Sequence, residues 1–312
     1  MRKSKSLLHP AAIAAGVAVG NLLIRYPWRS GAEAILPRFL LFALCALLPA
    51  LFFYPLFKKL YRGAISRHGG KRMIAIPVSC ALFVYALYGA WQAFSDYIGY
   101  AADLVLTARH EWLLAAAFLV LAAILAQTRK KGLDVFALLS VFAAVLCVLI
   151  LFLFGIPNFR AEFLSLRVTS LRPVAADSLS SLLEESFLPL LLLSAYFALT
   201  LGRHGGKALV LGAGVGYGLL LVCVLQTLFT FGADYAGSLP YPYAYAVRVI
   251  SIGPYFFRLE GFSYWLDYTA CLLRVSVFLA VAKRLFCRFL PRVGRYFPSF
   301  AALLLFIIFI LR

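Results

Sequence analysis

The sequence is dominated by apolar runs long enough to cross a lipid bilayer. A transmembrane helix needs about 20 predominantly apolar residues, because each residue rises ~1.5 Å through a hydrocarbon core of ~30 Å. Such runs recur along the whole chain and cover about residues 7–24, 37–57, 73–94, 112–127, 133–155, 183–202, 207–231, 255–283 and, more weakly, 297–311. The sequence therefore predicts an all-α polytopic membrane protein with about nine transmembrane helices.

The net charge of +18 could suggest nucleic-acid binding, but the distribution of the basic residues explains it otherwise. If the N terminus is cytoplasmic, every inner connection is basic, and Asp134 is the one acidic residue that falls in an inner connection. An excess of Lys and Arg in cytoplasmic loops sets the orientation of membrane proteins. We expect a multi-pass protein with a cytoplasmic N terminus and no nucleic-acid partner.

The N-terminal residues 1–23 are basic and then apolar, as in a signal peptide. We interpret this segment as a first transmembrane helix that is retained, because basic inner loops then alternate with mixed outer loops along the chain. The longest polar connection, about 156–181, is too short for a separate domain. We expect one transmembrane domain over residues 1–312.

The run with the most unusual composition lies between the Gly253-Pro254 turn and Pro291. A helix from about Tyr255 to Lys283 would be ~40 Å long. Within it, three charged residues recur every seven positions, a spacing that places them on one stripe of a helix. They are Glu260, Asp267 and Arg274.

This stripe should face protein or a water-filled cavity, because an ionisable group in hydrocarbon costs a few kcal/mol or more. Asp267 and Arg274 would lie ~10 Å apart along the axis, too far to pair directly. Each therefore needs another partner or water. A structural ion network and a functional pathway are both compatible with the pattern.

Three further predicted helices carry irregular or polar features. In the first, Gly16, Gly20 and Asn21 fit either close packing through small residues or a broken helix whose freed backbone groups line a binding site. In the third, Tyr85 and Tyr88 lie on an aromatic face, which serves either packing or ligand contact.

The sixth predicted helix is interrupted by Pro189, which would free a carbonyl group, and Ser194 follows it. In the seventh, the GAGVGYG segment at 212–218 lacks the preceding strand of a nucleotide site, so we interpret it as small-residue helix packing. The four histidines lie at the edges of the apolar runs and the six cysteines are scattered singly. We expect no metal, no cofactor, no catalytic residue and no enzymatic activity.

Two segments near the eighth predicted helix resemble a family signature. PYAYAVRVISIG at 242–253 leads into FRLEGFSYW at 257–265, and the basic Arg274 follows. The sequence Leu-Arg-Pro at 171–173 also matches a family motif. Together they resemble the spore germination permeases, the B subunits of nutrient germinant receptors, within the amino acid/polyamine/organocation superfamily.

The resemblance implies a LeuT-like bundle of two inverted five-helix repeats. The first repeat would cover about residues 7–155 and the second, lacking the family's tenth helix, about 182–312. A carboxylate usual in the family's sixth helix has no counterpart here, since Glu184 and Glu185 come about one turn early. This departure weakens the case for ion-coupled transport more than the case for ligand sensing.

In a LeuT-like bundle, a small ligand lies at the midplane against broken helices one and six, with helices three and eight completing the wall. The substrate-binding candidates are Gly16, Gly20, Asn21, Tyr85, Tyr88, Pro189 and Ser194. The gating or coupling candidates are Arg258, Glu260, Asp267 and Arg274.

The first functional hypothesis is a nutrient-sensing receptor subunit in the bacterial spore inner membrane. By resemblance, its ligand is a small-molecule germinant such as an amino acid, and its partners are an A-type membrane subunit and a C-type lipoprotein. The alternative is an ion-coupled amino acid transporter in which Asp267 carries a proton. A third hypothesis is a scaffold that binds no ligand.

Overall fold

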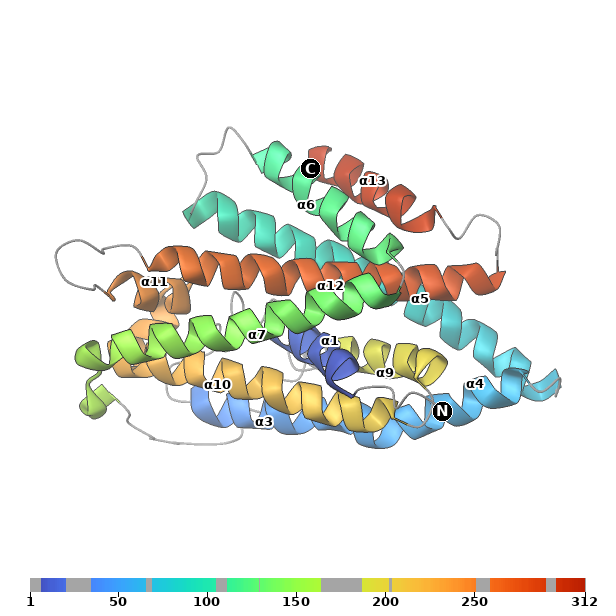
Figure 1. The fold of residues 1–312 in the computed structure, drawn as a ribbon, viewed down its shortest axis with the longest axis horizontal. Coiled ribbons are helices and arrows are strands. Elements are labelled where there is room, and N and C mark those ends of the chain that lie inside the picture. The colour runs from blue at the N-terminus through green and yellow to red at the C-terminus, as the bar shows by residue number, and fades with distance from the viewer. Residues whose placement is uncertain are drawn as a thin grey trace.

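The structure is a computed structural model that describes residues 7–20, 35–65, 69–104, 111–128, 130–163, 187–201, 204–250, 259–289 and 296–311. All regular structure in these ranges is helical (Figure 1). The α-helices are α1 (Leu8–Val19), α3 (Ile35–Leu48), α4 (Tyr54–Ile65), α5 (Gly69–Leu104), α6 (Glu111–Gln127), α7 (Lys130–Gly155), α9 (Leu188–Thr200), α10 (Gly205–Ser238), α11 (Pro242–Arg248), α12 (Glu260–Phe289) and α13 (Phe297–Ile310).

Every apolar run predicted from the sequence has a helical counterpart in the described residues. A π-helical turn at Pro49–Phe53 joins α3 to α4, so these helices run on from one another. Within the described residues, four segments are long and apolar enough to cross a membrane: Phe39–Tyr61, Ala75–Leu104, Gly132–Asn158 and Gly205–Ser238. The α12 helix has the necessary length, at 30 residues, but carries the charged stripe. The chain is a polytopic membrane protein, and its inverted repeat stays a prediction.

The short helix α1 lies at the centre of the bundle. All residues from Pro10 to Val19 are buried, so no side of this part of the helix is exposed. Helices α7, α9, α10 and α12 pack around it (Figure 1). With 12 residues it is ~18 Å long, less than the ~30 Å thickness of a hydrocarbon core. A helix that is apolar on all sides belongs inside a bundle, and α1 takes that place.

Glycines allow α10 to approach α1 closely. A Cβ atom at Gly212 would lie 2.2 Å from the Ala11 carbonyl oxygen, and one at Gly216 would lie 2.8 Å from the Ala15 carbonyl oxygen. Gly214, on another side of α10, has open space beside it. The GAGVGYG segment therefore packs helices together, as the sequence predicted.

The predicted interruption of the sixth helix by Pro189 stays a prediction, because residues 181–186 on its N-terminal side lie outside the described residues. The α9 helix begins at Leu188, so Pro189 lies in its first turn. Proline is tolerated there, because the first N–H groups of a helix have no acceptor within it. The α9 helix is 13 residues long, and Pro189 is buried.

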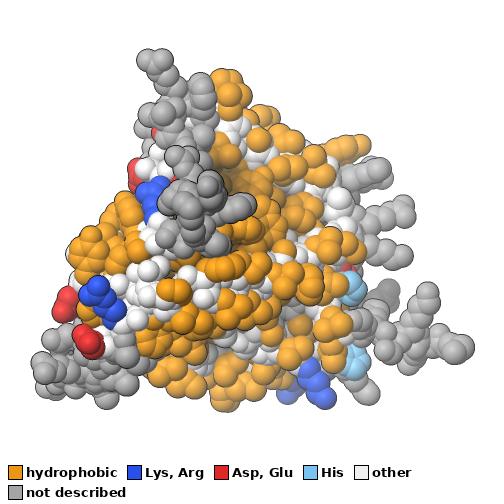
Figure 2. All heavy atoms as spheres, turned by 60° about the vertical axis from the view of Figure 1, so that its left-hand side comes forward, with side chains coloured by type: hydrophobic (Ala, Val, Ile, Leu, Met, Phe, Trp, Pro, Cys, Tyr) orange, Lys and Arg blue, Asp and Glu red, His pale blue; other side chains and the backbone are white. Residues whose placement is uncertain are grey.

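The surface of the bundle is largely apolar. Orange hydrophobic side chains cover most of the face shown in Figure 2, whereas charged groups lie towards its edges. Large exposed side chains such as Leu44, Leu139, Phe142 and Leu153 belong to helices that the sequence places in the bilayer. A soluble protein would avoid so large an apolar surface, whereas lipid favours it.

Candidate functional site

The charged stripe of α12 runs from one end of the helix into the core. Asp267 is 2% exposed and Arg274 is 4% exposed, so both face protein, as the sequence predicted. Glu260 is partly exposed instead and lies at the start of α12, beside α11. The stripe therefore has two deep members and one peripheral member.

Arg274 lies against the C-terminal end of α1. A Cβ atom at Gly20, which follows the last helical residue, would lie 2.5 Å from the Cδ of Arg274 and 2.9 Å from its Nη1. The guanidinium carbon also lies 5.6 Å from the centre of the Phe278 ring. In the described part of the chain, Nε and Nη1 of Arg274 have no hydrogen-bond partner. A buried cation thus keeps two free donors beside the end of a helix.

Asp267 lies about two helical turns from Arg274, in a part of the core rich in tyrosine. Its Oδ1 atom has no hydrogen-bond partner among the described residues. The Tyr100 hydroxyl is close to the carboxyl group but not in hydrogen-bond geometry. No ion pair joins Asp267 to Arg274 within the described residues, which agrees with the ~10 Å separation along the helix. Leaving such groups unpaired costs ~1–3 kcal/mol each, and more when they are charged.

Two of the predicted binding residues, Gly16 and Tyr85, contact α12 beside this stripe. Gly16 packs against α12, where a Cβ atom would lie 2.1 Å from the Leu273 Cδ2 atom. The rings of Tyr85 and Phe278 have centroids 6.5 Å apart. Ser194 is fully buried on α9, and its hydroxyl donates a hydrogen bond to the Leu191 carbonyl oxygen of its own helix.

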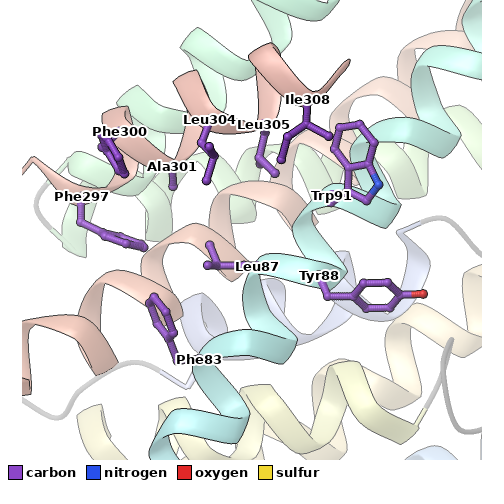
Figure 3. A pocket seen from close by; sticks show the side chains of 10 residues that line it. All are labelled: Phe83, Leu87, Tyr88, Trp91, Phe297, Phe300, Ala301, Leu304, Leu305 and Ile308. Atoms are coloured by element: carbon purple, nitrogen blue, oxygen red, sulfur yellow. The ribbon is translucent and has the colours of Figure 1, made fainter. Parts of the chain in front are cut away.

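Tyr88 does not lie with the other predicted binding residues. It is 51% exposed and lies, with Trp91, along an apolar groove of about 460 Å³ between α5 and α13. Figure 3 shows its ring pointing away from α13. Asn21 and Arg258 lie outside the described residues.

Phe278 is a site residue that sequence reasoning missed. It is fully buried, contacts Arg274 and Tyr85, and fills the space that a Cβ atom at Gly89 would occupy, 2.5 Å from its Cε2 atom. Its position four residues after Arg274 places it next to that side chain on the helix, which is the signal that could have identified it.

The cavity described next to α1 is small. It measures about 20 Å³ and is lined by residues of α1, α7, α10 and α12, among them Gly16, Ser140 and Thr269. A site of that size holds a single water molecule. The larger described grooves, about 460 Å³ each, both lie along α13 and are apolar. Neither Asp267 nor Arg274 lines any of these three spaces.

A polar clamp ties α11 to α12 and α5. The Nε atom of Arg248 lies 3.2 Å from Glu260 Oε2, and its Nη2 donates hydrogen bonds to the Tyr264 hydroxyl and the Leu104 carbonyl oxygen. Burial lowers the pKa of Arg248, but Tyr264 and Glu260 outweigh this and raise the pKa above its usual value. Tyr241 adds a 2.6 Å hydrogen bond to Asp103.

The family model described as spore germination protein matches residues 38–312. The chain belongs to the spore germination permease family. The match includes both signature segments, 242–253 and 257–265, and the whole of α12. In this spore germination permease, the Arg248–Glu260 ion pair of the clamp joins these two segments. The family is of the permease and receptor type rather than an enzyme family. No curated protein matches the chain closely enough to suggest a narrower role.

Proposed function

We propose that this spore germination permease is the nutrient-sensing subunit of a germinant receptor in the spore inner membrane. It binds a small nutrient, an amino acid, and transmits a conformational change to an A-type membrane subunit and a C-type lipoprotein. The observation that carries the proposal is Arg274, which is buried beside the end of α1 and whose Nε and Nη1 atoms have no hydrogen-bond partner among the described residues.

The shapes of α1 and α9 support this proposal. Within the described residues both helices are shorter than a bilayer span, both are largely buried, and they contact one another. In transporters with repeated architecture, short or interrupted helices in corresponding positions form the substrate site. Here they are the first helix of each proposed repeat.

The packing of α1 also supports a signalling role. A ligand beside Gly16 or Gly20 would have to move Leu273 or Arg274, because those side chains fill the available space. Binding would then favour a second arrangement of α1 and α12, and the shift is limited by the ligand's difference in affinity for the two states. The partner subunits would recognise this second arrangement of the two helices.

The deciding experiment is germination of spores that lack the gene against a panel of amino acids and sugars. We expect a selective defect for one or a few amino acids, restored by the wild-type gene. An unchanged response to every nutrient in the panel would contradict the proposal. If substitutions at Gly16 and Ser194 preserve the response but changes on lipid-facing surfaces prevent assembly, the protein is a scaffold.

The second candidate function is ion-coupled amino acid transport, which the buried carboxyl group of Asp267 favours. A carboxyl group in a transmembrane core is a common proton carrier in pumps and transporters. Uptake of labelled amino acids into proteoliposomes separates the two functions. Gradient-driven accumulation supports the transporter, whereas saturable binding without flux supports the sensor.

A further inference from the structure

The charge of Arg274 is not balanced by the described residues that surround it. Its side chain is 4% exposed, and its Nε and Nη1 atoms have no hydrogen-bond partner there. A buried cation without a partner is costly, and truncating one member of a buried ion pair commonly costs several kcal/mol for this reason. The described residues therefore do not provide the anion or strong acceptor that a buried guanidinium requires.

The nearby acidic groups do not supply that anion. Asp267 lies ~10 Å away along the same helix. Glu260 is farther still and is paired with Arg248. The C-terminal end of α1 carries a partial negative charge equivalent to about half an electron, which offsets part of the guanidinium charge.

The surroundings of Arg274 suit a small carboxylate. Gly20 brings backbone close to the guanidinium, Phe278 lies 5.6 Å from its carbon, and Tyr85 packs on Phe278. Arginine donates to carboxylate oxygens through short, charge-assisted hydrogen bonds, which are about twice as strong as neutral ones. The free donors of the buried guanidinium are what suit a carboxylate, whereas the C-terminal end of α1 disfavours an anion and has to move away when one binds.

We infer that Arg274 binds the carboxylate of the nutrient directly and is not merely a coupling residue. This inference rests on the proposed sensing function and restricts the ligand to small molecules that carry a carboxylate. In an α-amino acid the ammonium and carboxylate groups are attached to one carbon atom. The ammonium group of a ligand held at Arg274 therefore lies close to the guanidinium and is bound by groups other than Arg274.

The closed packing links ligand access to movement of α1. The described cavity between α1 and α12 holds one water, and Gly20 is already in close contact with Arg274. A carboxylate that enters between Gly20 and Arg274 can reach the free donors only after the end of α1 moves away from α12. Binding on this side of the guanidinium would therefore separate the two helices.

The test compares carboxylate recognition in the wild type and in variants at Arg274. Spores are exposed to the standard amino acids, each beside its primary amide, which keeps the ammonium group but lacks the negative charge. Ser276→Ala is the matched control, because Ser276 is fully buried on α12 and its hydroxyl is bonded to Leu272 of the same helix.

We expect the wild type to respond to the effective amino acid at a concentration about tenfold or more below that of its amide, since a hydrogen bond to a charged group contributes ~1.5–3 kcal/mol. Arg274→Gln should reduce the response to the acid until it equals that to the amide. Arg274→Lys, which keeps the charge, should give an intermediate preference, and Ser276→Ala should preserve the wild-type preference.

Immunoblots of spore membranes establish that each variant is present. If Arg274→Gln does not accumulate, the role of Arg274 is tested by the ratio of effective concentrations for acid and amide, compared between the wild type and Arg274→Lys. Equal potency of acid and amide in the wild type, or an undiminished preference in Arg274→Gln or Arg274→Lys, would overturn the role of Arg274 alone. Responses that do not depend on this gene would instead overturn the proposed sensing function.

Discussion

The Nε atom of Arg248 lies 3.2 Å from the Oε2 atom of Glu260, and this ion pair fastens α11 to the first turn of α12. The two residues are 12 positions apart, in the two signature segments at 242–253 and 257–265. The sequence grouped Glu260 with Asp267 and Arg274, either in a structural ion network or as candidates for gating or coupling. In the structure Glu260 pairs with Arg248, which explains why a glutamate is tolerated there.

Breaking this clamp should weaken the attachment of α11. Arg248→Gln or Glu260→Gln should each lower the thermal stability of the detergent-purified protein, with a coupling energy of about 1 kcal/mol between the two positions. The side chains are about one third exposed, so solvent screening keeps this energy small. A double-mutant cycle measures it, and a coupling energy near zero would contradict a contribution of the pair to stability.

The seam between α1 and α10 should tolerate no added methyl group. Gly212→Ala would place a Cβ atom 2.2 Å from the Ala11 carbonyl oxygen, a backbone atom that cannot rotate away. We expect it to destabilise the protein by about 1–3 kcal/mol, the usual cost of overpacking. Gly214→Ala is the control, because open space surrounds that position. Equal melting temperatures for the two variants in detergent would show that α1 and α10 pack less closely at Gly212 than these distances indicate.

Tyr85 and Tyr88 should differ in their effect on nutrient response. Tyr85→Ala removes the ring that packs on Phe278, beside Arg274, and aromatic pairs contribute ~0.5–1.5 kcal/mol. We expect the half-maximal nutrient concentration for germination to rise up to about tenfold. Tyr88→Ala should leave it unchanged, because Tyr88 lines the outer groove. The opposite order of effects would place the ligand wall on the α13 side of α5.

Asp267→Asn should separate sensing from proton-coupled transport. The amide keeps the shape of the side chain and removes a buried charge, so a sensor should retain its nutrient response within a few-fold. A transporter that uses this carboxyl group should lose gradient-driven uptake, because an amide cannot carry the proton. The measurement is uptake of labelled amino acids into proteoliposomes by the wild type and Asp267→Asn, made alongside germination of spores that carry each. Wild-type accumulation that disappears in Asp267→Asn would favour the transporter.

The positions of the helices could be predicted from the sequence, because the requirement behind them is local. Each span needs only its own apolar residues to shield the backbone from lipid, so the runs at 112–127 and 297–311 coincide with α6 and α13 to within a residue. The seven-residue spacing of Asp267 and Arg274 likewise placed them on one face, and the cost of a charge in lipid turned that face inward.

The tertiary structure decides which neighbouring helix each helix face contacts. Tyr85 and Tyr88 are three residues apart, yet one packs on α12 and the other lies in the groove beside α13. Glu260 pairs with Arg248 because α11 packs against α12. The space beside Gly16 is occupied by the side chain of Leu273. Helical periodicity specifies which residues share a side, whereas their contacts are decided by how the helices pack together.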